Sequence, residues 1–367
     1  MPKENKLVEL DKNMQSQQSA EKIVDWYSID DKPFVLDGLY WRRKGAPLRR
    51  IPLKCKISEG VDYLAWNTAG VMLRFKSDTS SITIDAKVSH TGMMPHMPPV
   101  ASKGFDVYIG SGKAKTYAAS SIFDAILEEY NVEIYKNEND GKIREFTIHF
   151  PLYAGVEKFR IGLSHGAKVL PPPPWQDDRP VVVYGTSIQQ GGCANRAGMC
   201  HTNIMSRMLN RRFINLGFSG NGKGEPQMAE LIATIKNPAM FILDYDANAQ
   251  ADGLRKTLSN FIDILRASHP ETPILLVSRL PYAYEFRDGI TFCQDREDFT
   301  EIHTSELKKR RKNGDKNIHF LDGFMLYGAN PAECTVDGVH ATDYGFMQIA
   351  QHMAPVIERI LTSGDQK

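Results

Sequence analysis

The first half of the chain alternates between apolar and polar residues with the period of a β-strand. The segment Ser81–Val88 alternates without interruption, as a strand with one buried face does. Turn-forming residues such as Asn139-Asp140-Gly141 separate such runs. Further strands are predicted at Tyr63–Asn67, Val71–Lys76, Phe105–Ile109, Val132–Tyr135, Arg144–Phe150 and Lys158–Leu163. Many short strands without helices between them favour an antiparallel sandwich.

A run of four prolines, Pro171–Pro174, ends this pattern. Consecutive prolines form neither a helix nor a central strand, so the run predicts a stiff, extended linker. We therefore expect a flexible N-terminal extension (1–22), a β-sandwich domain (23–170), a proline-rich linker (171–178) and a second domain (179–363).

After the linker, apolar strands alternate with helical segments. The predicted strands are Val181–Tyr184, Phe213–Leu216, Met240–Leu243, Ile274–Ser278 and Ile318–Leu321. The predicted helices are Thr202–Arg211, one from Pro226, Gly253–Ala267, Phe299–Arg311 and Asp343–Leu361, the last with Thr342 as N-cap. This order is typical of a parallel sheet covered by helices on both faces. The basic run Lys308–Lys312 is interpreted as the solvated end of a helix.

Composition narrows the possible functions. The 367 residues carry 45 Lys plus Arg against 44 Asp plus Glu, which argues against a general binder of nucleic acids or anionic membranes. The aliphatic runs are too short to span a bilayer. The polar start, Met1–Glu21, has no segment of signal-peptide type. We therefore expect a cytoplasmic protein, with an exported protein whose leader was trimmed as the alternative.

The five cysteines do not predict a disulfide framework. They are an odd number and widely spread, at positions 55, 193, 200, 293 and 334. Cys193, Cys200 and His201 suggest zinc at first sight, but no second pair of ligands follows them in the sequence. Buried thiols and no metal site are the expectation.

Two serines compete for the role of nucleophile. Ser164 lies in Gly162-Leu163-Ser164-His165-Gly166, a pattern that exposes a hydroxyl only where it joins a strand to a helix. Prolines follow within a few residues, so we interpret Ser164 as a strand-end residue. Ser187 follows the buried-type strand Val181–Tyr184, and ligands of open α/β sheets bind at the carboxyl ends of strands.

Residues elsewhere in the chain suit a nucleophilic role for Ser187. A hydroxyl needs an imidazole to take its proton and a carboxylate to orient the imidazole, and Asp337-Gly338-Val339-His340 offers both. Asn215–Gly222, which contains Gly220, ends one strand with small residues that let backbone N–H groups approach a ligand. Asn248 follows the next strand, and its carboxamide N–H could donate to the oxyanion that develops on the substrate carbonyl.

These segments, in this order, resemble the SGNH (GDSL-type) hydrolase superfamily over roughly residues 180 to 360. Its four blocks carry Ser, Gly, Asn and His, which the resemblance assigns to Ser187, Gly220, Asn248 and His340 with Asp337. The first block here is Gly-Thr-Ser-Ile rather than Gly-Asp-Ser-Leu, and the third is Asp-Ala-Asn-Ala. The resemblance implies a flavodoxin-like three-layer α/β/α domain.

A second resemblance covers the first half. Gly104-Phe105-Asp106-Val107-Tyr108 resembles the Gly-x-Asp-Leu-Tyr motif of β-sandwich domains that precede some bacterial SGNH hydrolases. The implied fold is a jelly-roll-like sandwich before the catalytic domain.

The loop His90–Pro99 is too rich in Met and Pro for a strand. One interpretation is an inter-domain packing loop. The other, which we carry as a prediction, is that Met94, His96 and Met97 reach the Ser187 pocket and line a substrate site.

The expected function is a serine esterase that uses an acyl-enzyme and needs no cofactor. By family analogy the substrate is a small-molecule or carbohydrate ester with a short acyl group. An acyltransferase is the nearest alternative, because an acyl-enzyme can pass its group to an alcohol. A carbohydrate-binding protein without catalysis is the alternative of another class.

Overall fold

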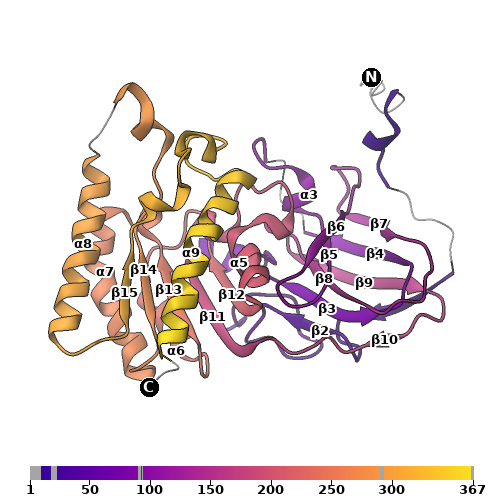
Figure 1. Ribbon diagram of the computed structural model, residues 1–367, viewed down its shortest axis with the longest axis horizontal. Coiled ribbons are helices and arrows are strands. Elements are labelled where there is room, and N and C mark those ends of the chain that lie inside the picture. Colours follow the sequence, from indigo (N-terminus) through magenta and orange to yellow (C-terminus); the bar gives the residue numbers. More distant parts are fainter. Residues whose placement is uncertain (1–9, 18–22, 90–91, 93, 290–292, 365–367) are drawn as a thin grey trace.

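The computed structural model describes residues 10–17, 23–89, 92, 94–289 and 293–364. A β-rich half and an α/β half lie side by side (Figure 1). Most of the predicted extension 1–22 lies outside the described residues, as do His90, Thr91 and Met93 of the Met-rich loop. Within 10–17, the Gln17 N–H donates to the Ile122 carbonyl at 2.7 Å.

The first half is a sandwich of two antiparallel sheets, as predicted. One sheet has the order β1-β9-β4-β7, with bounds Val24–Ser28, Val156–Ser164, Ser81–Val88 and Glu129–Lys136. The other has the order β10-β3-β8-β5-β6, with bounds Val169–Leu170, Met72–Ser77, Arg144–His149, Asp106–Ile109 and Thr116–Ser120, and β2 (Val35–Asp37) pairs with β3. Buried aromatic residues, including Phe75 and Phe146 stacked at 5.2 Å, fill the space between the sheets.

One predicted strand is wrong. The segment Tyr63–Asn67 is not extended, because α2 (Glu59–Leu64) runs into it. Ser58 is the N-cap, and its side chain accepts the Val61 N–H at 3.2 Å. Val61 and Leu64 are buried three positions apart, the spacing of one face of a helix, and Val61 lies outside the residues for which the strand was predicted.

The second half is a three-layer α/β/α domain of the expected flavodoxin-like type. Its parallel sheet has the order β12-β11-β13-β14-β15, with bounds Arg211–Gly217, Asp177–Gly185, Met240–Asp244, Ile274–Val277 and Ile318–Leu321. The helices are α4 (Ser187–Gln190), α5 (His201–Leu209), α6 (Pro226–Ala233), α7 (Asp246–Ser268), α8 (Gln294–Lys312) and α9 (Asp343–Gly364). Shorter helices are α3 (Pro99–Ser102), η1 (Lys12–Met14), η2 (Ala197–Met199), η3 (Ala283–Gly289), η4 (Gly323–Tyr327) and η5 (Pro331–Cys334).

The alternation of side chains along β11 builds the two faces of this domain. Val181 and Val183 pack into the core that α5 and α9 cover. Val182 and Tyr184 point to the opposite core, beneath α6, α7 and α8. The central strand is therefore buried on both faces, as its continuous apolar run predicts.

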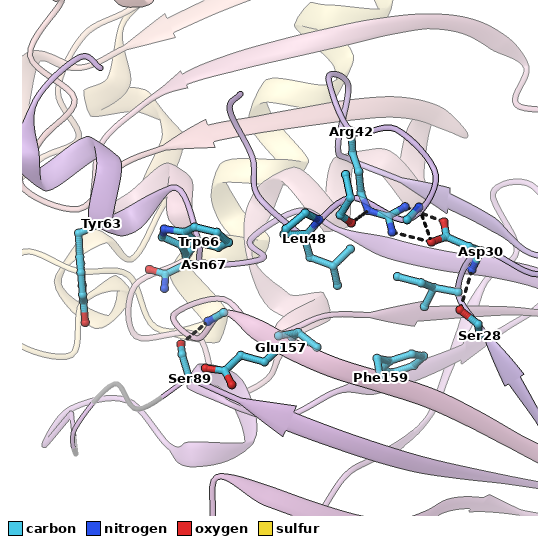
Figure 2. Close-up of a pocket in the computed structure, with 16 residues that line it drawn as sticks. Ser28, Asp30, Arg42, Leu48, Tyr63, Trp66, Asn67, Ser89, Glu157 and Phe159 are labelled. Carbon is cyan, nitrogen blue, oxygen red and sulfur yellow. Dashed lines mark hydrogen bonds and ion pairs between the residues drawn. The ribbon is translucent and has the colours of Figure 1, made fainter. Parts of the chain in front are cut away.

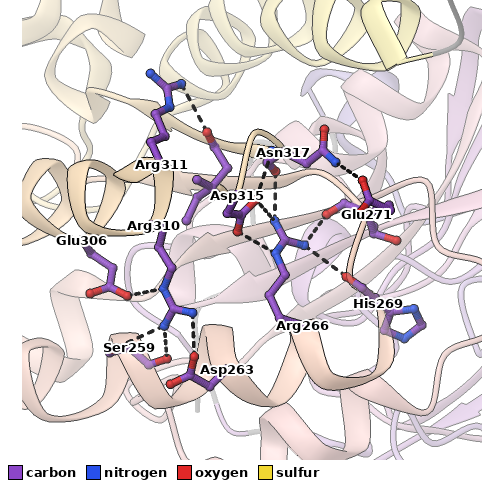
Figure 3. A network of polar contacts seen from close by, with 12 residues as sticks. Ser259, Asp263, Arg266, His269, Glu271, Glu306, Arg310, Arg311, Asp315 and Asn317 are labelled. Atoms are coloured by element: carbon purple, nitrogen blue, oxygen red, sulfur yellow. Dashed lines mark hydrogen bonds and ion pairs between the residues drawn. The ribbon is translucent and has the colours of Figure 1, made fainter. Parts of the chain in front are cut away.

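The basic run at the end of α8 contributes to packing. Arg310 donates to Asp263 at 2.6 Å on α7 and to Glu306 on its own helix (Figure 3). Arg311 donates to the Ile318 carbonyl at 3.3 Å. The run ends a helix, as expected, but these two residues have partners within the chain.

Buried polar contacts join the two halves. Asp106, in the motif of the second resemblance, accepts the Gly198 N–H at 2.7 Å and Arg196 Nη1 at 3.0 Å. Arg50, also fully buried, donates to the Gly217 carbonyl at 2.6 Å. The proline-rich segment is packed, because the buried Trp175 after it donates to Asp37 at 3.1 Å. β11 begins at Asp177, inside the segment 171–178 expected to be linker.

Candidate active site

Ser187 lies at the turn between the central strand and a short helix. β11 ends at Gly185, and Thr186 caps α4 with a capping box that includes Gln189. A Cβ on Gly185 would approach the Asp244 carbonyl oxygen to 2.3 Å, so only glycine allows the turn to pass so close to β13. The sharp turn presents the Ser187 hydroxyl above the carboxyl edge of the sheet.

A chain of hydrogen bonds joins Ser187, His340 and Asp337. Ser187 Oγ lies 2.9 Å from His340 Nε2. His340 Nδ1 lies 2.7 Å from Asp337 Oδ2. The three side chains that the sequence analysis singled out thus meet, although Ser187 and His340 are 153 positions apart.

Asp337 is held as a carboxylate by its own turn. Its Oδ1 accepts the N–H groups of Val339 at 2.9 Å and His340 at 2.7 Å. Burial raises the pKa of Asp337, but the hydrogen bonds from His340 and Val339 outweigh burial and leave the pKa below its ordinary value. Gly338, at φ +90°, permits the tight turn between the acid and the histidine.

The two segments expected to bind an oxyanion start level with the serine turn. Gly185 pairs with Gly217 on β12 and with Asp244 on β13, so the segments after these strands share one edge of the sheet. Gly220 follows β12 at φ +68°, and a Cβ built there would meet nothing within 4 Å. Asn248 lies in the first turn of α7, and its Oδ1 is buried without a hydrogen-bond partner among the described residues.

The Met-rich loop reaches the same site. His96 Nε2 lies 3.7 Å from Asp337 Oδ2, and the His96 ring meets the His340 ring edge-on at 5.8 Å. Met97 is 3% exposed and belongs to the core cluster that also contains Ile188. Met94 is half-buried against that cluster. The loop therefore packs between the domains with Met97 and brings His96 to the catalytic candidates.

The rejected residues lie in other environments. Ser164 ends β9, and its Oγ accepts the Ser81 N–H at 3.0 Å within the sandwich. Cys200 lies 3.3 Å from Thr202 Oγ1. His201 stacks on Phe346, and burial lowers the pKa of His201 to about 3. Cys193, by contrast, lies close to Asp337 and His340.

The sequence analysis missed several residues that support the serine turn. Gln189 donates through its side chain to the buried Asp244. Burial, together with the charge of Asp246, raises the pKa of Asp244 well above its ordinary value. Tyr153, from the sandwich half, directs its hydroxyl to the Ser187 carbonyl at 3.4 Å. No pattern in the sequence pointed to Tyr153, because it lies in the other half of the chain.

A hollow of about 710 Å³ opens beside the sandwich (Figure 2). Tyr63 and Trp66, both exposed, line it together with polar residues. Asn67 is part of its wall and accepts a hydrogen bond of 3.0 Å from Gln190, three residues after Ser187. One hydrogen bond therefore connects the wall of the hollow to the helix that carries the serine.

Comparisons with known proteins identify both halves. Residues 178–358 match the GDSL-like Lipase/Acylhydrolase family, and residues 24–169 match the GxDLY family, described as the N-terminus of Esterase SGNH hydro-type. The fold and these matches define a carboxylic ester hydrolase of the SGNH class. The chain carries a GDSL-like lipase/acylhydrolase domain with a GxDLY domain before it, as the two resemblances implied.

Solved structures extend the likeness to nearly the whole chain. A GDSL-like lipase candidate from Bacteroides ovatus is 28% identical, with a TM-score of 0.81, and the match covers 93% of this chain and 98% of that one. Salicylyl-acyltransferase SsfX3 from a tetracycline biosynthetic pathway is 20% identical, with a TM-score of 0.70 and coverage of 91% and 97%.

The acetyl xylan esterase Est2A from the rumen bacterium Butyrivibrio proteoclasticus is 11% identical, with a TM-score of 0.58 and coverage of 93% and 99%. At these identities SsfX3 and Est2A share the fold with this chain. A search of curated protein sequences found no significant match. None of the helices in the described part of the chain has both the length and the apolar character needed to cross a bilayer.

Proposed function

We propose that this protein is a serine esterase in which Ser187 is the nucleophile, His340 the general base and Asp337 the residue that orients the base. The observation that supports this proposal is the hydrogen-bonded chain from Ser187 Oγ through the His340 ring to Asp337 Oδ2, at 2.9 and 2.7 Å. An unactivated hydroxyl is a weak nucleophile, and this arrangement supplies the activation.

The reaction runs in two halves. Ser187 Oγ forms a bond to the ester carbonyl carbon while its proton passes to His340 Nε2. The tetrahedral intermediate collapses, the C–O bond to the alcohol breaks, and His340 returns the proton to the leaving alkoxide. A water molecule, deprotonated by His340, then attacks the acyl-enzyme and releases the acid and Ser187. No metal or organic cofactor takes part in these steps.

The oxyanion is stabilised by the N–H groups of Ser187 and Gly220 and by the carboxamide of Asn248. Ser187 is the first residue of α4, so its N–H has no acceptor within that helix. The open space at Gly220 leaves room for a ligand oxygen. Loss of one donor is expected to raise the barrier by about 3 kcal/mol.

For the substrate we propose a short acyl ester of a carbohydrate alcohol. The hollow near α4 supports this choice, because its exposed Tyr63 and Trp66 offer broad apolar faces beside polar groups, which suits a sugar ring. The proteins of similar fold include an acetyl xylan esterase. They also include an acyltransferase, so transfer of the acyl group to an alcohol is the second candidate function.

Turnover of p-nitrophenyl acetate tests the assignment. Ser187→Ala is expected to abolish turnover and labelling by a fluorophosphonate probe while the protein stays folded. Ser164→Ala, which removes the other serine that fits a hydrolase pattern, is the matched control and is expected to keep full activity. Activity that survives in Ser187→Ala but not in Ser164→Ala would overturn the proposal.

A deacylation experiment on the wild-type acyl-enzyme distinguishes the two candidate functions. The deacylation rate in water is compared with the rate in the presence of a soluble sugar alcohol. A hydrolase releases acetate at a rate that the sugar leaves unchanged. A transferase forms the acetylated sugar in preference to free acetate. A chain that binds oligosaccharides but is never acylated would instead support the non-catalytic alternative.

A further inference from the structure

Four potential metal ligands converge beside Ser187. His96, Cys193, Asp337 and His340 each offer one ligand atom, and these atoms all lie within 4.8 Å of one another. Both imidazoles face the same carboxylate oxygen, because Asp337 Oδ2 lies 2.7 Å from His340 Nδ1 and 3.7 Å from His96 Nε2. The ligands come from three separate segments of the chain, so no spacing in the sequence indicates that they form a cluster.

The donor set selects a thiophilic cation. Two imidazole nitrogens, a sulfur and a carboxylate oxygen suit Zn²⁺, whereas Mg²⁺ and Ca²⁺ prefer oxygen ligands. Tetrahedral zinc holds its ligands at about 2.0 to 2.3 Å, so neighbouring ligand atoms lie roughly 3.3 to 3.8 Å apart. Side-chain shifts of about 1 Å would bring a cluster of this span into that geometry.

Two of the ligands have no part in the proposed reaction. Cys193 is buried at φ +74°, between Gly192 and Ala194, and this backbone conformation holds its thiol next to the acid and the histidine. His96 is half-buried, and its Nδ1 has no hydrogen-bond partner among the described residues. Neither side chain is needed for the transfer of the serine proton, so their convergence on Asp337 calls for another explanation.

We propose that His96, Cys193, Asp337 and His340 form a site at which Zn²⁺ binds and inhibits the enzyme. Binding releases the Cys193 thiol proton to solvent and forms a bond between sulfur and the metal. It also draws Asp337 and His340 out of their mutual hydrogen bond, so the base loses its orienting carboxylate. Zinc binding follows from the geometry of the four ligands, while the inhibition rests on the proposed function.

A binding experiment tests the site independently of turnover. In the full chain carrying Ser187→Ala, titration with Co²⁺ is expected to give the charge-transfer absorption of a thiolate–cobalt bond. Zn²⁺, measured by competition with a chromophoric chelator, is expected to displace cobalt with one ion per chain. Adding Cys193→Ser removes the absorption band and weakens zinc binding about tenfold or more, since loss of even an outer-shell partner costs about that much.

Cys193→Ala is a second variant in case serine disturbs the fold, and thermal unfolding of each variant checks that the chain is intact. Cys55→Ser is the matched control, because Cys55 is a half-buried free cysteine outside the cluster of four ligands, and it is expected to leave the zinc titration unchanged. The proposal would be overturned if folded Cys193→Ser and Cys193→Ala bound zinc as tightly as the Ser187→Ala parent. It would also be overturned if the parent showed no cobalt–thiolate band.

Inhibition is then measured in the wild type with p-nitrophenyl acetate. Zn²⁺ is expected to stop turnover and EDTA to restore it, whereas Mg²⁺ has no effect. Cys193→Ser, which is outside the proposed triad, is expected to keep its basal turnover and to need about tenfold more zinc for half-inhibition. Zinc binding in a chain without esterase activity would refute the proposed function alone. Full activity with zinc bound would refute the inhibition alone.

Discussion

At the scale of single residues, the carboxylate of Asp337 holds the His340 ring in one tautomer. It accepts two backbone N–H groups and the His340 ring N–H, and these contacts fix one tautomer of the imidazole. Asparagine would keep the shape but offer an amide N–H to His340 Nδ1. Asp337→Asn is therefore expected to retain the fold and lose activity by about 10³- to 10⁴-fold in kcat.

Steady-state kinetics of Asp337→Asn, with circular dichroism as the check on folding, measures this loss. Asp343→Asn is the comparison, because Asp343 lies three residues after His340 in the sequence. Its side chain accepts the Asn195 N–H at 2.8 Å. If Asp337→Asn turns over substrate like wild type, another group orients the histidine.

Motifs predicted the meeting of Ser187, Asp337 and His340 better than the residues that surround them. Each of the three lies at the end of a predictable element or in a short block of fixed spacing, and their catalytic roles stay a prediction. His96 was expected near the site because its loop cannot be a strand. Met97 was expected to line a pocket, but it is almost completely buried in the core, so that role stays a prediction. Cys193 was considered only with Cys200 and His201 and set aside, and its place beside Asp337 was not predicted, since that place depends on a backbone turn that the sequence does not reveal.

At the scale of elements, β5 is coupled to η2 through the Asp106 carboxylate. Asp106 is completely buried and pairs with Arg196 at 3.0 Å. Removing one member of a buried ion pair leaves the other charge without compensation. Asp106→Asn is therefore expected to lower the free energy of unfolding by about 3 kcal/mol, measured by urea denaturation.

An exposed ion pair between the same two halves provides the control. Lys113 and Glu358 pair at 2.9 Å, and both side chains are about half exposed, at 51%. Exposed pairs of this kind are worth about 1 kcal/mol or less, so Glu358→Gln is expected to change stability little. Equal effects of Asp106→Asn and Glu358→Gln would show that burial of the Asp106 pair adds nothing.

The junction of β11 and β12 has a pH-dependent contact. Burial raises the pKa of Asp177, but hydrogen bonds from Arg179 and Arg211 outweigh burial and lower the pKa to about 2. The ordinary value in an unfolded chain is about 3.9. Because the folded pKa is the lower one, this contact stabilises the protein above pH 4 and is lost as the pH falls toward 2.

Asp177→Asn is accordingly expected to lower the free energy of unfolding by about 1 to 2 kcal/mol at pH 7. The difference from wild type should shrink in denaturation curves recorded at successively lower pH below 4. Asp178→Asn is the matched control, because that neighbouring side chain is exposed. A difference that stays constant down to pH 2 would contradict the assignment.

Periodicity predicted most elements of this chain. Ser81–Val88 was found to the residue, and the parallel sheet followed from apolar runs separated by helical segments. The helix α2 was missed because the predicted strand Tyr63–Asn67 is a short apolar run that fits a strand or a helix, while the cap at Ser58 that indicates a helix lies outside those five residues. The order of strands within the sandwich was not predictable, since it depends on long-range pairings.

At the scale of the whole molecule, the two halves share one hydrophobic cluster. Ala69, Met97 and Leu152 from the sandwich half pack in the same core as Ile188 and Ala197 from the α/β half. A cut between the halves would expose this apolar surface on both sides, and exposed apolar surface favours aggregation. The serine turn would also lose the contact with the Tyr153 hydroxyl.

The intact chain is therefore expected to unfold in one cooperative transition, and Arg50 tests the coupling. Its guanidinium is fully buried in the first half, donates to the Gly217 and Leu64 carbonyls, and has a pKa that burial lowers to about 9. Arg50→Met removes the guanidinium donor from the buried Gly217 carbonyl, whereas the Leu64 carbonyl keeps the Asn67 N–H at 3.0 Å, and a buried carbonyl left without a partner costs about 1 to 3 kcal/mol. Differential scanning calorimetry should show a single transition that shifts to lower temperature as a whole. Two separate transitions, with only one of them shifted, would mean that the halves fold independently.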